Sequence, residues 1–242
     1  MEKLNWSAPD LLSYSKNNLP ALMFEQLNDS IGSISKRQTI CLFHRDQFKS
    51  AYYSFLAEDA GIGEVFISLI SNSVEMSDEE SEMWIACTSH AVGYVQSAHA
   101  VIDTIAHAIY YAHGGESGNT FCRIREQKVS IYKIQRRLIS DQLYTNLSEA
   151  INNLLEKDEF LYLNDLANLI KHRHLVPIER TNDQEVLSGR LHGMVFKPFT
   201  KDNGIQHEGI ELSTFFEKTH EPIFTSIIDI GRELNVSLNL EP

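Results

Sequence analysis

The chain has 242 residues, of which 43% are hydrophobic and 22% are charged. This composition is typical of a folded globular protein and excludes the disordered, collagen-like and coiled-coil classes. The formal net charge of −12 disfavours binding to nucleic acid or to an anionic membrane over a broad surface, because both need clustered cations. Nucleic acid could then be bound only by a local basic patch.

The cysteine pattern and the N-terminal sequence indicate a cellular compartment. Cys41, Cys87 and Cys122 lack the spacing of metal ligands, which predicts free thiols in a reducing environment. The N-terminal residues lack an apolar core long enough for a signal peptide, and the longest uncharged stretch, residues 83–102, is too polar to span a membrane. We therefore expect a cytoplasmic protein without a membrane segment.

The first 76 residues predict an N-terminal segment of short helices. Apolar residues recur at helical spacing in three stretches, residues 21–27, 48–56 and 64–70. A predicted long helix follows, beginning at Ser77 and ending at Gly114-Gly115. Ser77 and Glu80 have the spacing of a capping box, and the acidic residues around them favour a helix N-terminus. Its core stripe comprises Val95, Ala98, Ile102, Ile105 and Ile109.

Later helices and a short β-hairpin complete the predicted fold. Helices are expected at residues 131–138, 141–155 and 159–175, ending before Pro177. Residues 179–184 are predicted to be a polar link. Two strands, at 191–196 and 205–212, flank a turn at 202–204, and a last helix with a face of Ile223, Ile227, Ile230 and Leu234 follows. The expected class is mainly α: a helical core over 77–176 around a long central helix, with 177–242 adding the hairpin and last helix to the same domain.

One late helix carries the clearest candidate site. Asn168 and His172 are four residues apart and therefore share one flank of a helix. An amide and an imidazole beside a cation, Lys171 or Arg173, can hold a phosphate or move a proton during RNA cleavage. His174 adds a further basic group to this predicted RNA-binding set.

The long central helix together with residues 167–173 (ANLIKHR) resembles the HEPN superfamily of helical bundles. The resemblance covers residues 77–176. Many HEPN proteins are metal-independent ribonucleases of toxin–antitoxin or defence systems, others are not catalytic, and many form homodimers. Their motif is an Arg followed by four to six residues and then a His. If His172 takes the place of the motif His and Asn168 takes the place of the residue after the Arg, Ala167 stands where the Arg is expected.

Three functions remain open from the sequence. The first is a non-catalytic, HEPN-like interaction module, which the missing Arg favours. The second is a metal-independent ribonuclease, with His172 as the acid–base group and Asn168 with Lys171 or Arg173 holding the phosphate. Both imply no cofactor, and the partners they imply are RNA, another protein and a second copy of the chain.

The third open function is a metal-dependent helical-bundle enzyme. His99, Asp103 and His107 lie at i, i+4 and i+8 on one stripe of the long helix, and two imidazoles with a carboxylate can bind a divalent metal. A polar pair beside an apolar stripe is more often structural, so no metal is favoured. The remaining histidines near the hairpin, His192, His207 and His220, are interpreted as scattered surface residues.

Overall fold

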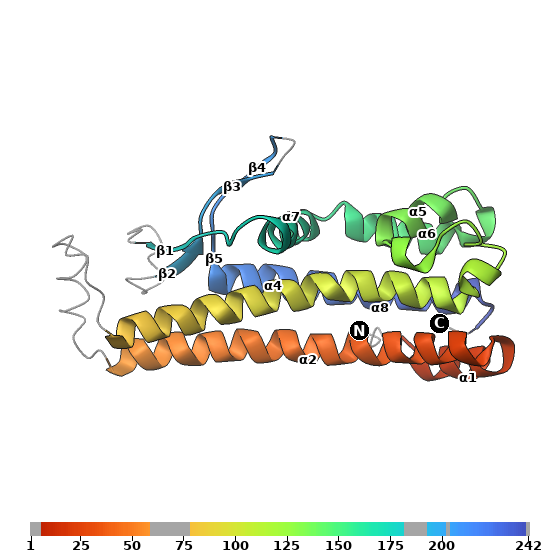
Figure 1. The fold of residues 1–242 in the computed structure, drawn as a ribbon, viewed down its shortest axis with the longest axis horizontal. Coiled ribbons are helices and arrows are strands. Elements are labelled where there is room, and N and C mark those ends of the chain that lie inside the picture. Colours follow the sequence, from red (N-terminus) through yellow and green to blue (C-terminus); the bar gives the residue numbers. More distant parts are fainter. Residues whose placement is uncertain (1–5, 59–77, 182–192, 202–203, 241–242) are drawn as a thin grey trace, which may run out of the picture. The chain divides into compact units, whose positions relative to one another are not determined.

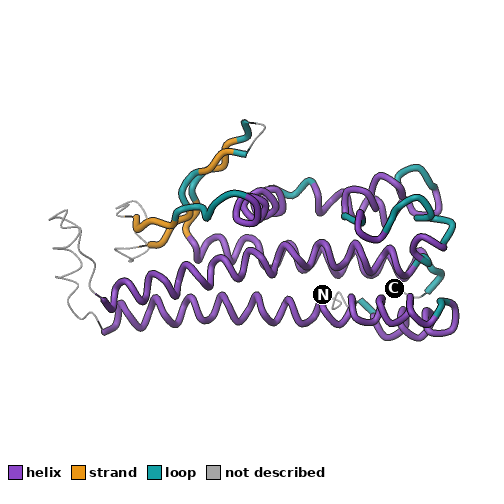
Figure 2. The backbone as a smooth tube through the Cα atoms, viewed as in Figure 1, coloured by secondary structure: helices purple, strands orange, loops and turns teal. Residues whose placement is uncertain are grey.

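The computed structural model describes residues 6–58, 78–181, 193–201 and 204–240. Helices make up most of them and short antiparallel strands lie towards the C-terminal part, which confirms the mainly α class (Figures 1 and 2). The chain divides into two compact units. Unit 1 comprises Met1–Thr39, Ser97–Asn164 and Thr219–Pro242, and unit 2 comprises Ile40–Gln96 and Asp165–Lys218. Each unit therefore draws residues from all three predicted segments of the chain.

The helices follow the sequence pattern closely in the second half of the chain. The described helices are α1 (Ala8–Asn18), α2 (Ala21–Glu58), α4 (Asp78–Ala112), α5 (Ile131–Leu138), α6 (Thr145–Leu155), α7 (Asp158–His172) and α8 (Leu212–Ser237). Single 3-10 turns lie at Gly115–Ser117, Glu126–Lys128 and Gln142–Tyr144.

The prediction of short helices in the N-terminal segment is wrong for α2, which runs without a break from Ala21 to Glu58. Its buried residues lie three, four or seven apart, as in Ile31, Ile34 and Cys41, so they form one continuous stripe. Polar residues inside this stripe hide the periodicity in any short window. The helix predicted at 64–70 lies outside the described residues.

The long helix is confirmed as α4, and its predicted stripe from Val95 to Ile109 is at most 2% exposed. Gly114, just after its end, has a φ of 81°, in the left-handed region that glycine tolerates best. The capping residue Ser77 lies outside the described range. In α8, the predicted face at Ile223, Ile227, Ile230 and Leu234 is also buried, and the helix continues through Pro222.

In unit 1, the segments that are farthest apart in the sequence are in contact. The indole Nε1 of Trp6 donates to Oδ1 of Asn235 at 3.1 Å, and Nδ2 of Asn235 donates to the carbonyl of Ser7 at 2.9 Å. Asn235 is fully buried, so these bonds satisfy a side chain that water cannot reach. A Cβ added at Gly231 would lie 2.2 Å from the Trp6 ring, so glycine there makes room for the indole.

His113 makes the stability of unit 1 depend on pH. Its ring packs between Phe121 and Tyr144, and burial lowers the pKa of the imidazole below its ordinary value of 6.5, partly offset by the hydrogen bond to the carbonyl of Ile109. Below pH 6.5 the unfolded chain takes up this proton first, so the stabilisation is complete above 6.5 and is lost as pH falls through the folded-state pKa.

Urea unfolding at several pH values tests this prediction with the variant His113→Phe. The unfolding free energy of the native protein minus that of the variant should shrink as pH falls from about 7.5 to about 5. Parallel pH profiles for the two proteins would contradict it.

The strands all belong to unit 2. β1 (Ile178–Thr181), β2 (Gly193–Phe196) and β5 (Ile210–Glu211) form one antiparallel sheet in the order β1-β2-β5, with Phe196 opposite Ile178 and Ile210. β3 (Phe199–Thr200) pairs with β4 (Gln206–His207) in a second antiparallel ladder. The antiparallel return predicted for this region is thus confirmed, but the predicted strand at 205–212 is divided into β4 and β5, and Leu212 begins α8 (Leu212–Ser237). Residues 191–192 and 202–203 lie outside the described ranges.

The polar link predicted at residues 179–184 is wrong where β1 covers it. Glu179 pairs with Val195 and Arg180 with Met194, so β1 is held by main-chain bonds to β2. Only the first of its four residues, Ile178, is apolar, so the sequence carried no hydrophobic alternation to detect.

An aromatic cluster forms the core of unit 2. The Phe215 ring lies 5.4 Å from Phe196, 5.8 Å from Tyr94 and 5.9 Å from Phe216, and Phe216 also meets Phe48 at 5.2 Å. All five rings are buried. They join β2 to segments of α2, α4 and α8 and so fix the base of the strands.

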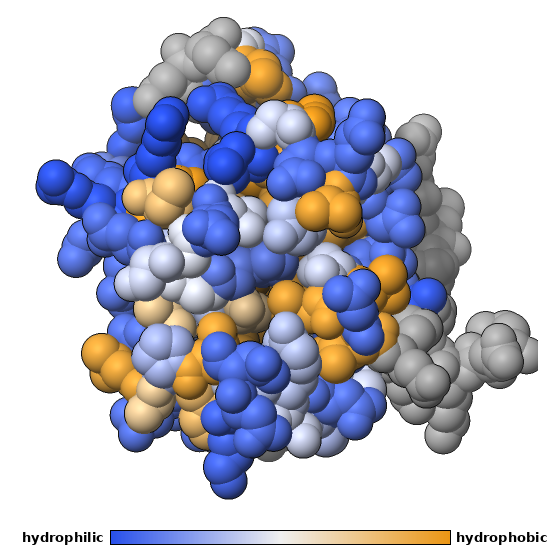
Figure 3. Space-filling model, turned by 90° about the vertical axis from the view of Figure 1, so that its right-hand side faces the viewer, coloured by the Kyte–Doolittle hydropathy of each residue, from blue (hydrophilic) through white to orange (hydrophobic). Residues whose placement is uncertain are grey.

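Surface apolar residues are present but dispersed. Ile139 and Leu143 of unit 1 are 68% and 82% exposed, and Figure 3 shows hydrophobic residues in several patches on a mostly hydrophilic face. Among the helices that the structure describes, none combines the length and the hydropathy needed to cross a bilayer.

Candidate functional site

A pocket in unit 2 collects much of the predicted site. It has a volume of about 200 Å³. Its lining residues are Asp165, Asn168, Leu169, His172 and Arg173 at the end of α7, with Phe199, Thr200 and Lys201 in and after β3. Pockets for whole organic ligands usually measure about 300–1,000 Å³, so this pocket suits a small group such as a phosphate.

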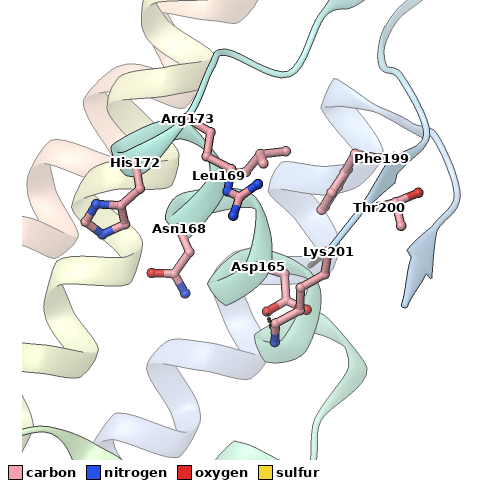
Figure 4. Close-up of a pocket in the computed structure, with 8 residues that line it drawn as sticks. All are labelled: Asp165, Asn168, Leu169, His172, Arg173, Phe199, Thr200 and Lys201. Carbon is pink, nitrogen blue, oxygen red and sulfur yellow. Dashed lines mark ion pairs between the residues drawn. The ribbon is translucent and has the colours of Figure 1, made fainter. Parts of the chain in front are cut away.

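The local sequence explains how α7 presents polar groups here. Leu166 and Ala167 are fully buried, whereas Asn168 and His172 are exposed on another flank. The four-residue spacing places the amide and the imidazole on the same ridge, as predicted. Figure 4 shows these two side chains on one side of α7, with the Arg173 guanidinium turned towards Leu169.

A buried carboxylate links α7 to the strands. The Asp165 side chain is 4% exposed, and its oxygens lie 2.6 Å from Nζ of Lys201 and 3.0 Å from Nε2 of His207. The His207 ring stacks on Phe199, with the ring centres 4.7 Å apart. The Lys201 ammonium offsets the negative charge of Asp165, which would otherwise repel an anion from the pocket.

The interpretation of His207 as a scattered surface residue is therefore wrong. Its side chain is 12% exposed because the Phe199 ring covers it and Asp165 binds it. His192 lies outside the described residues.

The structure separates the five predicted RNA-contacting residues into two groups. Asn168, His172 and Arg173 line the pocket, whereas Lys171 and His174 are exposed and do not belong to its lining. Ala167, which stands at the position of the motif Arg, is buried and also lies outside the lining. Within the pocket lining, α7 therefore supplies its cation from Arg173, after the His rather than before it.

The three residues predicted as metal ligands on α4, His99, Asp103 and His107, make structural contacts instead. Nε2 of His99 lies 3.3 Å from Oδ1 of Asn164, and its Nδ1 lies 3.7 Å from the Asp103 carboxylate. Nδ1 of His107 lies 2.8 Å from the main-chain oxygen of Asp103, so this ring bonds to its own helix. Across residues 6–58, 78–181, 193–201 and 204–240, no three His, Cys, Asp or Glu side chains are grouped to hold a metal.

One wall of the pocket was not indicated by the sequence. Phe199 and Thr200 of β3, with Lys201 just after it, lie more than 25 residues beyond α7 in the chain. The strand alternation around the turn at 202–204 predicts a hairpin that contains these residues. It does not predict which element that hairpin packs against.

Comparison with protein-family models, with curated proteins and with solved structures finds no match for this chain. The geometry of the pocket is therefore the basis for a functional proposal.

Proposed function

We propose that this protein is a HEPN-like helical module that binds RNA without cleaving it, by holding a backbone phosphate in the unit 2 pocket. The observation that carries the proposal is that Asn168, His172 and Arg173 line one small pocket. Their side chains supply hydrogen-bond donors of three kinds: an amide, an imidazole and a guanidinium.

The chemistry of these donors matches a phosphate diester. A guanidinium presents parallel N–H groups that bind two phosphate oxygens at once, and its charge makes these hydrogen bonds about twice as strong as neutral ones. The Asn168 amide and the His172 ring lie on the flank next to it. Because Lys201 offsets the charge of Asp165, the charge of Arg173 is left to favour an anion in the pocket.

The buried Ala167 supports a binding role over a catalytic one. A guanidinium at this position would have to leave the core to reach a phosphate, and the alanine removes that group altogether. With a net charge of −12, the rest of the surface repels RNA, so we expect weak binding that a few contacts dominate. The RNA affinity should then fall only slightly as the salt concentration rises, since the steepness of this fall scales with the number of phosphates neutralised.

A matched pair of variants tests the proposal. Arg173→Ala and Lys171→Ala each remove one positive charge near the end of α7, but only Arg173 lines the pocket. With a fluorescein-labelled single-stranded RNA of mixed sequence, Arg173→Ala should weaken binding about tenfold or more, because a charged hydrogen bond contributes about 1.5–3 kcal/mol. Lys171→Ala should change affinity less than about threefold.

Fluorescence anisotropy at fixed low salt measures these affinities, with circular dichroism to check folding. Equal losses in both variants would indicate diffuse surface attraction and would contradict the pocket. Failure of the native protein to bind the RNA would overturn the proposed function.

A second function uses the same pocket. His172 shares the lining with Arg173, so an acid–base group and a phosphate-binding cation are present even though the motif Arg is missing. We propose, as the alternative, a metal-independent ribonuclease that uses these two groups. Incubation of the same RNA in EDTA separates the two functions: cleavage that disappears in His172→Ala but persists in His174→Ala would replace the binding-only proposal.

A further inference from the structure

Two histidines of unit 2, neither of them in the pocket lining, face each other across a helix pair. His44 lies on α2 and His90 on α4, and their Nδ1 atoms are 3.1 Å apart. The two segments run antiparallel, because Cys41 meets the main-chain oxygen of Tyr94 while Cys87 meets that of Phe48. Both imidazoles are half-buried, so their rings are ordered by neighbours yet can be reached from solvent.

The separation of the two nitrogens is close to that of a shared metal ion. Zinc binds imidazole nitrogen at about 2.0–2.1 Å with tetrahedral angles, which places two such nitrogens about 3.3–3.4 Å apart. The observed 3.1 Å between the Nδ1 atoms of His44 and His90 is shorter by a few tenths of an ångström. A small rotation of either ring therefore suffices to admit an ion between them.

The surrounding residues hold the two rings in this arrangement. The ring of Phe43 meets His44 edge-on at 5.5 Å and His90 at 6.1 Å. Opposite them, Gly93 leaves space for His44, since a Cβ there would lie 2.4 Å from its Cε1 atom. The geometry is thus fixed before any ligand arrives, which lowers the entropic cost of binding.

We propose that His44 and His90 form a binding site for one divalent cation of the Zn²⁺, Ni²⁺ or Cu²⁺ class. Imidazole nitrogen is a preferred ligand of these ions. Within the described ranges no third His, Cys, Asp or Glu joins the pair, so water completes the coordination shell. The site is independent of the RNA pocket and of its proposed function.

Metal titration of the untagged full-length protein tests the site. Isothermal titration with Zn²⁺ should show one strongest site, and His90→Ala should weaken it about tenfold or more, because it removes one of two protein ligands. His107→Ala, which removes another histidine of α4, should leave that site unchanged. Equal binding by native protein and His90→Ala would overturn the proposal.

Two further measurements do not depend on removing a ligand. In Gly93→Ala both imidazoles remain but the added Cβ occupies the place of the His44 ring, so Zn²⁺ affinity should fall, whereas Gly32→Ala, where a Cβ meets nothing within 4 Å, should not change it. Electron paramagnetic resonance of the native protein with one equivalent of Cu²⁺ should show coupling to two imidazole nitrogens. Coupling to a single imidazole would contradict the pair.

Discussion

Replacing Phe215 by alanine should lower the free energy of unfolding by about 3–5 kcal/mol, the usual cost of removing a fully buried aromatic ring. Phe215 is fully buried and contacts three other buried rings: Phe196, Tyr94 and Phe216. The loss should be near the upper end of that range, because ring–ring contacts add about 0.5–1.5 kcal/mol each beyond the area they bury.

Urea unfolding followed by circular dichroism measures this effect. Ile85→Ala is the control, since Ile85 also belongs to unit 2 but is 62% exposed, and it should change stability by less than about 0.5 kcal/mol. Similar losses in the two variants would show that the aromatic cluster is not the core of unit 2. Because Phe215 anchors β2, which is followed directly by β3, the variant should also bind RNA less well than Ile85→Ala.

Replacing Lys201 by methionine should destabilise the protein by about 2–3 kcal/mol. The Asp165 carboxylate that it binds is 4% exposed, and although Lys201 itself is 39% exposed, its removal leaves a buried negative charge that water solvates poorly. His207 remains beside Asp165 after the substitution. We therefore expect a smaller loss of stability than the about 3–5 kcal/mol that breaking a fully buried ion pair costs.

A second lysine of unit 2 with nearly the same exposure provides the control. Lys197 is 41% exposed, against 39% for Lys201, but its partner Glu179 is 56% exposed, so Lys197→Met should cost less than about 1 kcal/mol. Adding Asp165→Asn to Lys201→Met should restore part of the stability, since the unpaired charge is then gone. Equal losses for the two lysines, or no recovery in the double variant, would contradict a buried ion pair at Asp165.

Where the signal was local, the sequence predicted the fold well. α5 has the predicted bounds, Ile131–Leu138, because its buried residues Ile131, Ile134 and Leu138 repeat within two turns. α4 was equally clear, as its apolar stripe continues over several turns. The unbroken α2 was missed because its stripe is interrupted by polar residues, and only packing against other segments makes it one helix.

The candidate site was predictable only in part, for the same reason. The i, i+4 spacing of Asn168 and His172 follows from helix geometry alone. The other wall, with Phe199 and Lys201, depends on how β3 folds back towards α7, and no local rule joins residues so far apart in the chain. The His44–His90 contact is likewise a tertiary event, since the two residues lie on different helices.

The bond between Trp6 and Asn235 has a consequence for how the protein is made. The two residues are 229 positions apart, so unit 1 cannot be completed until nearly all of its chain has been synthesised. At about 5–20 residues per second, the N-terminal segment waits roughly 10–45 s for its partner. During that time Leu11, buried in the finished fold, lacks the part of its core that the C-terminal segment supplies.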